Sequence, residues 1–180
     1  DHQGNDVSDR LKDIDYWYAI EHQPGLFQGV VEPHFIELDL AQFSEDSEQP
    51  GFSVGTPATV KLYLTGWIFP TDTSINVSIS QNPAVTSTFP YLQVQDKRGE
   101  WQTVMNPIGI PAGKNKTVVT DLTGKFLSAS RKVRIVTDMQ VYWDRAFFTL
   151  GKQEVSTVVT ELRPQIATLQ YLGFPKLYRP

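Results

Sequence analysis

The chain has 180 residues, of which 40% are hydrophobic and 20% are charged, and its formal net charge is −4. This length and composition fit one globular domain with a sizeable core and exclude an intrinsically disordered chain. The net negative charge, with basic residues never in runs longer than two, argues against nucleic acid and anionic membranes as partners.

Three further absences narrow the chemistry and the setting of the chain. There is no cysteine, so disulfides, thiolate metal sites and cysteine nucleophiles are excluded. No apolar run approaches the roughly 18 residues of a membrane-spanning helix, so membrane insertion is not expected. No signal peptide is visible, and the chain begins at Asp1 without methionine, which indicates a processed product or an excised domain.

The N-terminal part, residues 1–26, is predicted to form an arm that lies against the rest of the domain. Apolar residues recur there at helical spacing, at Val7, Leu11, Ile14 and Tyr18. With Ser8 as a candidate cap, this spacing predicts a short helix at about Ser8–Asp15, with an ordered arm as the alternative.

Segments in which apolar and polar residues alternate dominate the rest of the chain, and this is the pattern of a strand with one buried face. The densest is Arg131–Leu150, whose 20 residues outrun an ordinary strand at roughly 3.3 Å per residue. It is therefore expected to form two strands or one bent strand, with Asp138 at its midpoint as the turn or bulge. The other predicted strands are, in chain order, Val30–Leu40, Ala58–Trp67, Ile75–Ile79, Tyr91–Gln95, Trp101–Met105, Thr117–Leu122, Glu154–Leu162 and Gln165–Leu172.

About nine or ten strands without a βαβ unit favour an all-β fold. The predicted architecture is an antiparallel two-sheet β-sandwich of jelly-roll type with one short N-terminal helix. An immunoglobulin-like sandwich is the alternative, which the length and the missing cysteine pair disfavour. Residues 1–172 are expected to form a single domain, followed by a tail at Gly173–Pro180.

Three patterns associated with catalysis or metal binding lack the context that they need. Gly51–Gly55 matches G-x-S-x-G, but no strand precedes it and no helix follows it to strain and expose the serine. Gly109–Lys114 approximates a phosphate-binding loop but is one residue short, and β-branched residues follow it in place of a helix. The histidines His2, His22 and His34 show no metal-binding spacing, and His34 is expected to be a hydrogen-bonded histidine at a strand end.

Calcium is the metal for which the sequence offers candidate ligands, because calcium prefers hard oxygen donors. Candidate ligands are Glu32, Asp39, Asp72, Asp138 and Asp144, of which Asp138 and Asp144, both in the densest strand segment, are favoured. No calcium-binding loop motif accompanies them, and isolated aspartates more often cap turns.

Aromatic residues beside polar side chains indicate a carbohydrate-binding surface, because a sugar ring stacks on an aromatic face while Asp or Asn binds its hydroxyls. Trp143 is expected in the core instead, since it shares a strand face with Met139 and Val141. The predicted ligand-binding residues are Trp67, Asp72, Asn76, Tyr142, Asp144 and Arg145.

Four segments together resemble the C-terminal region of large bacterial proteins of the FG-GAP and ASPIC/UnbV type, which often also carry tetratricopeptide repeats. They are FQGVVEPHFIELDL (Phe27–Leu40), GWIFPTDTSINVSISQ (Gly66–Gln81), GIPAGKNKTVVTDLTG (Gly109–Gly124) and RIVTDMQVYWDRAFF (Arg134–Phe148). The resemblance covers most of residues 1–150 and implies a segment of a secreted or envelope multidomain protein, with no catalytic residues to carry over. More loosely, the order T-D-L-T-G, R-K-V-R-I, Y-W-D is similar to galactose-binding-like jelly rolls.

The sequence therefore predicts a non-catalytic binding or interaction module, located outside the cell or in the cell envelope, with a glycan or a protein as its partner. The alternatives are a structural subunit of an extracellular assembly, oligomeric or multidomain, and a carboxylate-based glycoside-active enzyme.

Overall fold

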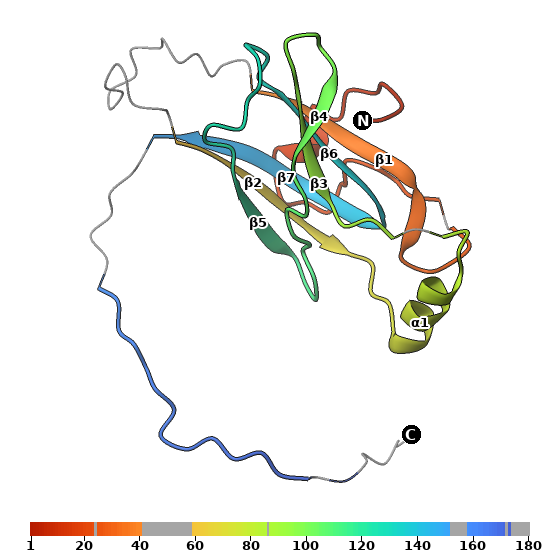
Figure 1. The fold of residues 1–180 in the computed structure, drawn as a ribbon, viewed down its shortest axis with the longest axis vertical. Helices are drawn as coiled ribbons and strands as arrows, with labels where there is room; N and C mark the ends of the chain where they lie inside the picture. The colour runs from red at the N-terminus through yellow and green to blue at the C-terminus, as the bar shows by residue number, and fades with distance from the viewer. Residues whose placement is uncertain (24, 41–58, 86, 152–157, 172, 174–180) are drawn as a thin grey trace.

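The computed structural model describes the whole chain except residues 24, 41–58, 86, 152–157, 172 and 174–180. The described residues contain seven strands, one α-helix and one short 3-10 helix (Figure 1). The G-x-S-x-G motif and nearly all of the predicted tail lie outside them. The element bounds are η1 Ser8–Leu11, β1 Val30–Asp39, β2 Val60–Ile68, α1 Thr73–Gln81, β3 Tyr91–Gln95, β4 Trp101–Met105, β5 Lys116–Asp121, β6 Lys132–Met139 and β7 Val141–Leu150.

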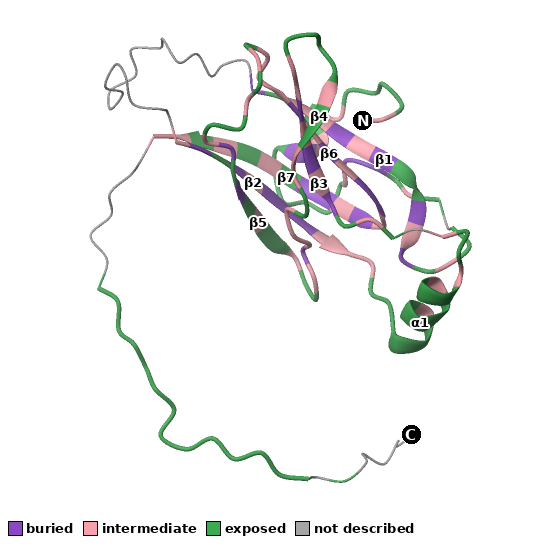
Figure 2. Cartoon of the chain, in the orientation of Figure 1, coloured by how far each residue is buried: buried purple, intermediate pink, exposed green. Residues whose placement is uncertain are grey.

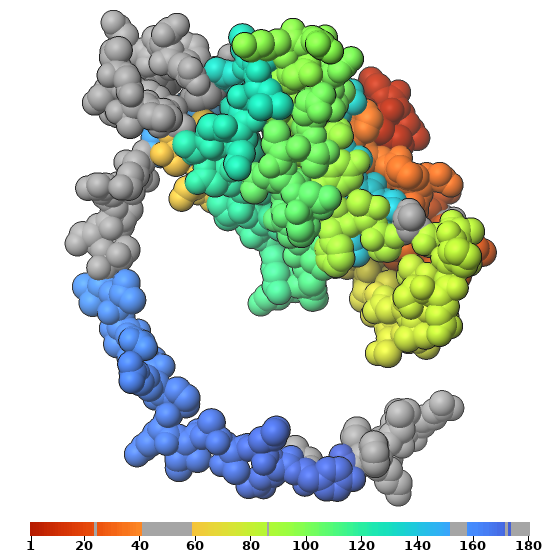
Figure 3. All heavy atoms as spheres, in the orientation of Figure 1, coloured from red at the N-terminus to blue at the C-terminus, as the bar shows by residue number. Residues whose placement is uncertain are grey.

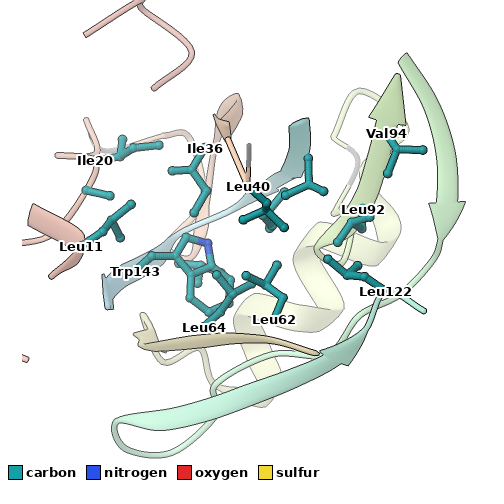
Figure 4. Packing of buried hydrophobic residues seen from close by; sticks show 14 of the residues in the cluster. Leu11, Ile20, Ile36, Leu40, Leu62, Leu64, Leu92, Val94, Leu122 and Trp143 are labelled. Atoms are coloured by element: carbon teal, nitrogen blue, oxygen red, sulfur yellow. The ribbon is translucent and has the colours of Figure 1, made fainter. Parts of the chain in front are cut away.

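The seven strands form two antiparallel sheets, with strand orders β1-β6-β3-β4 and β5-β2-β7. Side chains from both sheets, such as Leu62, Val94 and Ile135, meet in one core and are at most 1% exposed. Figure 4 shows these apolar side chains filling the space between the sheets, and Figure 2 shows the buried residues concentrated on the strands. The prediction of an all-β fold built from two antiparallel sheets is confirmed.

The densest segment of the sequence supplies one strand to each sheet. β6 and β7 are separated by Gln140 alone, where the chain passes from the four-stranded to the three-stranded sheet. The Gln140 backbone is bonded on both sides, because its amide donates to Gly29 O at 3.0 Å and its carbonyl accepts from Phe69 N at 2.9 Å. Of the two alternatives, the structure shows two strands, but they are divided at Gln140 and not at Asp138, which lies within β6. Trp143 is 2% exposed and belongs to the core, also as predicted.

Helix α1 occupies the segment predicted as the strand Ile75–Ile79, so that prediction is wrong. Asp72 begins the helix, because its side chain accepts from the amide of Ile75 at 2.8 Å and so caps the first turn. Ile75 and Ile79 are half-buried while Val77 between them is 46% exposed. Residues four apart lie on one side of a helix, so this burial follows helical spacing and not alternation.

The N-terminal arm, residues 1–23, forms a shorter helix than predicted. η1 ends at Leu11 and not near Asp15. The amides of Asp15 and Tyr16 donate to the Asp144 carboxylate instead of to helical carbonyls, at 3.4 and 3.0 Å, which stops the helix. The arm nevertheless joins the core through Leu11, Ala19 and Ile20, and the Ala19 amide donates to Trp143 O at the edge of β7.

The C-terminal segment, residues 158–171, contains no strand, so the predicted strand Gln165–Leu172 is wrong, as is the described part of Glu154–Leu162. Alternation alone builds no strand where no neighbouring strand pairs with it. Every residue of the segment is exposed. Figure 3 shows the segment as a thin extended chain that leads away from the two sheets. Within the described residues, no helix has the length and apolar character needed to cross a bilayer.

Candidate functional site

The outer face of the β5-β2-β7 sheet carries a row of apolar side chains that we call the aromatic strip: Val119, Tyr63 and Phe147. Leu62 and Leu64 point into the core, so the alternation of β2 turns Tyr63 outward. The register places Tyr63 opposite both Val119 on β5 and Phe147 on β7. The Tyr63 and Phe147 rings are stacked, with centres 4.7 Å apart and planes only 3° from parallel.

The aromatic strip is open to solvent, with Val119 52% exposed and Phe147 38% exposed. On the same face of the sheet, a row of polar residues lies on each side of the strip. On one side Lys61 is paired in register with Asp121 and with Thr149. On the other side, the row of Thr117, Thr65 and Arg145 brings the Arg145 guanidinium 4.9 Å from the centre of the Phe147 ring. The strip is therefore an apolar surface on the outer face of the sheet, with polar residues on either side of it.

The structure brings two of the predicted ligand-binding residues together, Trp67 and Tyr142. They are opposite each other on β2 and β7, and their rings are stacked with centres 5.1 Å apart and planes 11° from parallel. Tyr18 of the N-terminal arm packs against this pair, with its ring centre 5.0 Å from that of Tyr142. Trp67 and Tyr142 are both half-buried. The pair is thus partly covered by the arm and offers less open surface than the aromatic strip.

Asp144, a third predicted ligand-binding residue, is fully buried at a bulge in β7. Thr65 is opposite Arg145 and Gly66 is opposite Trp143, so Asp144 has no partner on β2. Its Oδ1 accepts the two arm amides, while Oδ2 is buried without a hydrogen-bond partner among the described residues. Burial raises the pKa of this carboxyl group above its ordinary value. Asp144 therefore fastens the N-terminal arm, whereas its neighbour Arg145 is exposed.

Asp72 and Asn76, the remaining predicted ligand-binding residues, are exposed at the start of helix α1. The Asp72 carboxylate accepts from Ile75 N and from the Ser74 hydroxyl, and these hydrogen bonds lower its pKa. Asn76 Oδ1 accepts from the Thr71 hydroxyl at 2.8 Å. Both side chains serve the local structure of the helix and do not belong to the aromatic strip.

The two favoured calcium candidates, Asp138 and Asp144, do not form one site, and each carboxylate already accepts hydrogen bonds from other residues. Asp138 is buried, and its carboxylate accepts from the amide of Thr88 and from the Thr88 hydroxyl, the latter at 3.1 Å. Asp144 binds the arm amides. Across the described residues, no group of three or more His, Asp or Glu side chains is arranged to hold a metal ion.

A cleft of about 1020 Å³ lies between the N-terminal arm, β1 and β7. Its apolar lining includes Leu38, Leu40, Leu62 and Phe148. Arg134 and Glu37 also line it, but they are paired with each other at 3.0 Å and the Arg134 guanidinium lies over the rings of Phe35 and Trp101. The cleft thus has an apolar lining and a pair of opposite charges that are bonded to each other.

The sequence contains a partial signal for the aromatic strip. The outward direction of Tyr63 follows from alternation, since Lys-Leu-Tyr-Leu-Thr places it on the face opposite two leucines. Its stacking on Phe147 does not follow, because it depends on the register between β2 and β7 and on the bulge at Asp144. Comparison with protein-family models, with curated proteins and with solved structures finds no match to this chain, so its function is argued from this surface.

Proposed function

We propose that the chain is a non-catalytic binding module whose ligand is a glycan, bound on the aromatic strip. The observation that carries the proposal is the stacked pair of Tyr63 and Phe147, in which Phe147 is 38% exposed and Tyr63 is half-buried. Each ring turns one face to the other, so the exposed edges and outer faces of the pair, with Val119 beside them, are the apolar surface that the apolar face of a sugar ring would contact.

The rows beside the strip support a polar ligand and not a purely apolar one. Lys61 and Thr149 on one side and Arg145 on the other supply donors at the edge of the rings, where sugar hydroxyls project. The strands hold these side chains at fixed spacing, so little conformational freedom is lost when a ligand binds.

The setting of the module follows from the resemblance of its segments. We propose a secreted or envelope location in a bacterial multidomain protein, and a jelly-roll connection of the strands as the finer topology. The motifs at Phe27–Leu40, Gly66–Gln81, Gly109–Gly124 and Arg134–Phe148 support this setting.

A glycan array followed by calorimetry with the strongest ligand tests the function. Tyr63→Ala and Phe147→Ala should each weaken binding roughly two- to tenfold, because one stacked ring contributes roughly 0.5–1.5 kcal/mol. Phe89→Ala is the matched control, since Phe89 is a 48% exposed aromatic residue outside the strip and its loss should change nothing.

Other outcomes would replace the proposal. Glycan binding that survives both strip substitutions would remove the strip as the site. Capture of a protein partner that depends on Tyr63 and Phe147 would show that the strip binds protein and not a glycan. Turnover of a glycoside that a single Asp or Glu substitution abolishes would make the chain an enzyme.

A second candidate function is a structural subunit of an assembly, and the C-terminal segment favours it. Six large apolar side chains there are 81–102% exposed, namely Val158, Val159, Leu162, Ile166, Leu169 and Tyr171. Such a run of exposed apolar surface is typical of a segment that docks on another protein surface. Light scattering of the chain with and without residues 158–180 tests this candidate through the oligomeric state.

A further inference from the structure

All three histidines of the chain converge at one place, although they lie far apart in the sequence. We call them the histidine cluster: His2 and His22 of the arm, and His34 on β1. The ring centres of His22 and His34 are 4.5 Å apart, and those of His2 and His34 are 6.0 Å apart. His22 also packs edge-on against Tyr142 of β7 at 5.0 Å. The cluster therefore joins the N-terminal end of the chain to both sheets.

Hydrogen bonds to backbone carbonyls fix the protonation of two of these rings. His34 Nδ1 is 3.0 Å from Glu32 O and His22 Nε2 is 2.9 Å from Val141 O. A carbonyl only accepts, so each of these nitrogens carries the hydrogen. In neutral His34 the other nitrogen, Nε2, is then bare, and it is buried with no hydrogen-bond partner among the described residues. The predicted hydrogen bond of His34 is confirmed, but the residue lies in the middle of β1, beside a register shift, and not at a strand end, and its Nε2 is unsatisfied.

The surroundings of His34 disfavour a second proton on the ring. His34 is 4% exposed, and burial lowers its pKa to about 4, with the neighbouring His22 and His2 acting in the same direction. Burial also lowers the pKa of His22. The facing groups on the sheets are uncharged: Tyr142 on β7, and Thr137, which is opposite His34 on β6. Asp138, the next residue on β6, is engaged by Thr88, and Glu32 reaches His34 through its backbone carbonyl.

We propose that the histidine cluster is an acid-sensitive latch, which holds the N-terminal arm on the sheets at neutral pH and releases it on acidification. The docked arm covers apolar surface, because Leu11, Ala19 and Ile20 belong to the core and the arm forms one wall of the 1020 Å³ cleft. Release would open the apolar lining of that cleft. The inference is independent of glycan binding on the aromatic strip.

The direction follows from proton linkage. Release of the arm places His22 in solvent and uncovers His34, which stays on β1, so both should titrate near the ordinary pKa of 6.5, whereas with the arm docked His34 has a pKa of about 4. The released state therefore binds more protons below pH 6.5, and the ratio of released to docked chains rises about tenfold per pH unit for each histidine involved. For His34 this continues until the pH reaches about 4.

Other charged groups on the arm do not mimic this response. Asp144 also fastens the arm, but its raised pKa means that acid favours the docked state at this position. The ion pairs Arg10–Glu21 and Lys12–Asp9 have both partners on the arm, so docking leaves them unchanged.

Hydrogen exchange of the intact chain at pH 7.5 and pH 5.0, corrected for intrinsic exchange rates, tests the latch. Peptides from residues 1–23 should lose at least tenfold protection at pH 5.0, while β2 and β3 keep theirs. His34→Gln and His22→Gln each retain a side-chain N–H for the carbonyl but do not titrate, so each should reduce the pH response by about one proton. The second variant serves if the first does not fold, because His22 is only half-buried. Asp144→Asn is the matched control and should retain the histidine response.

Three results would overturn the latch. Exchange in residues 1–23 that does not change with pH would show that the cluster is inert. Equal loss of protection in the arm and in the strands would show global unfolding instead of arm release. Protection of the arm by Zn²⁺ or Ni²⁺ at neutral pH, lost in His34→Gln, would make the cluster a metal site.

Discussion

Trp143 shows how the pairing of two strands fixes a single side chain. It is 2% exposed, faces the core beside Leu64, and lies opposite Gly66, which offers no side chain of its own (Figure 4). A Cβ atom on Gly66 would lie 2.2 Å from the carbonyl oxygen of Tyr142, so this position of β2 requires glycine. The indole and the glycine are thus matched across the pair of strands.

Trp143→Ala should lower the free energy of unfolding by about 3–5 kcal/mol, the range for emptying a buried aromatic site. Urea denaturation measures this change. Trp17→Ala is the control, because Trp17 is 52% exposed under the Arg10 guanidinium and should change the stability by no more than about 0.5 kcal/mol. A loss under about 1 kcal/mol for Trp143→Ala would contradict the burial of this residue.

At the scale of elements, alternation predicted β1 to β7 because each of these strands has one face on the core. It failed at α1, where Ile75, Val77 and Ile79 fit both a period of two and a helical turn. The Asp72 cap decided between them, since a capping aspartate supplies an acceptor for the first turn. It failed again in residues 158–171, where the pattern continues but no strand among the described residues pairs with it. A local pattern predicts an element, but a partner or a cap must confirm it.

The arrangement of the predicted site residues could likewise be predicted from the sequence only in part. Trp67 and Tyr142 were predicted as part of one surface, and they stack on each other. Asp144 was predicted beside them, but the bulge and the arm bury it, and neither is visible in the local sequence. Contacts across strands require the register, which one sequence does not specify.

Helix α1 provides a test of the cap. Asp72→Ala should speed amide exchange in Thr73–Gln81 several-fold, because the Ile75 amide loses its acceptor. Asp72→Asn keeps an acceptor oxygen and should exchange like the wild type. No residue of α1 is buried, so neither substitution should shift the main unfolding transition. Exchange unchanged in Asp72→Ala would mean that the cap does not hold the helix.

At the scale of the whole molecule, the two sheets and the arm form the packed body, and the described C-terminal segment adds nothing to it. Residues 158–171 are exposed throughout, and none belongs to the core. A chain that ends at Gly151 should therefore melt within about 2 °C of the full chain by calorimetry. A large drop in the melting temperature would show that the segment contacts the body in solution.

The position of β6 and β7 in the chain has a consequence for synthesis on the ribosome. β6 lies between β1 and β3 in one sheet, and β7 supplies the second neighbour of β2 in the other. A nascent chain that has reached only residue 130 therefore holds β1 without any pairing strand, and its pairing of His34 with Thr137 must close a loop of about a hundred residues. Both sheets are completed by the same 20 residues, 131–150, which emerge late. Folding of this domain is consequently delayed until most of it has left the exit tunnel, and its exposed strand edges need protection during that interval.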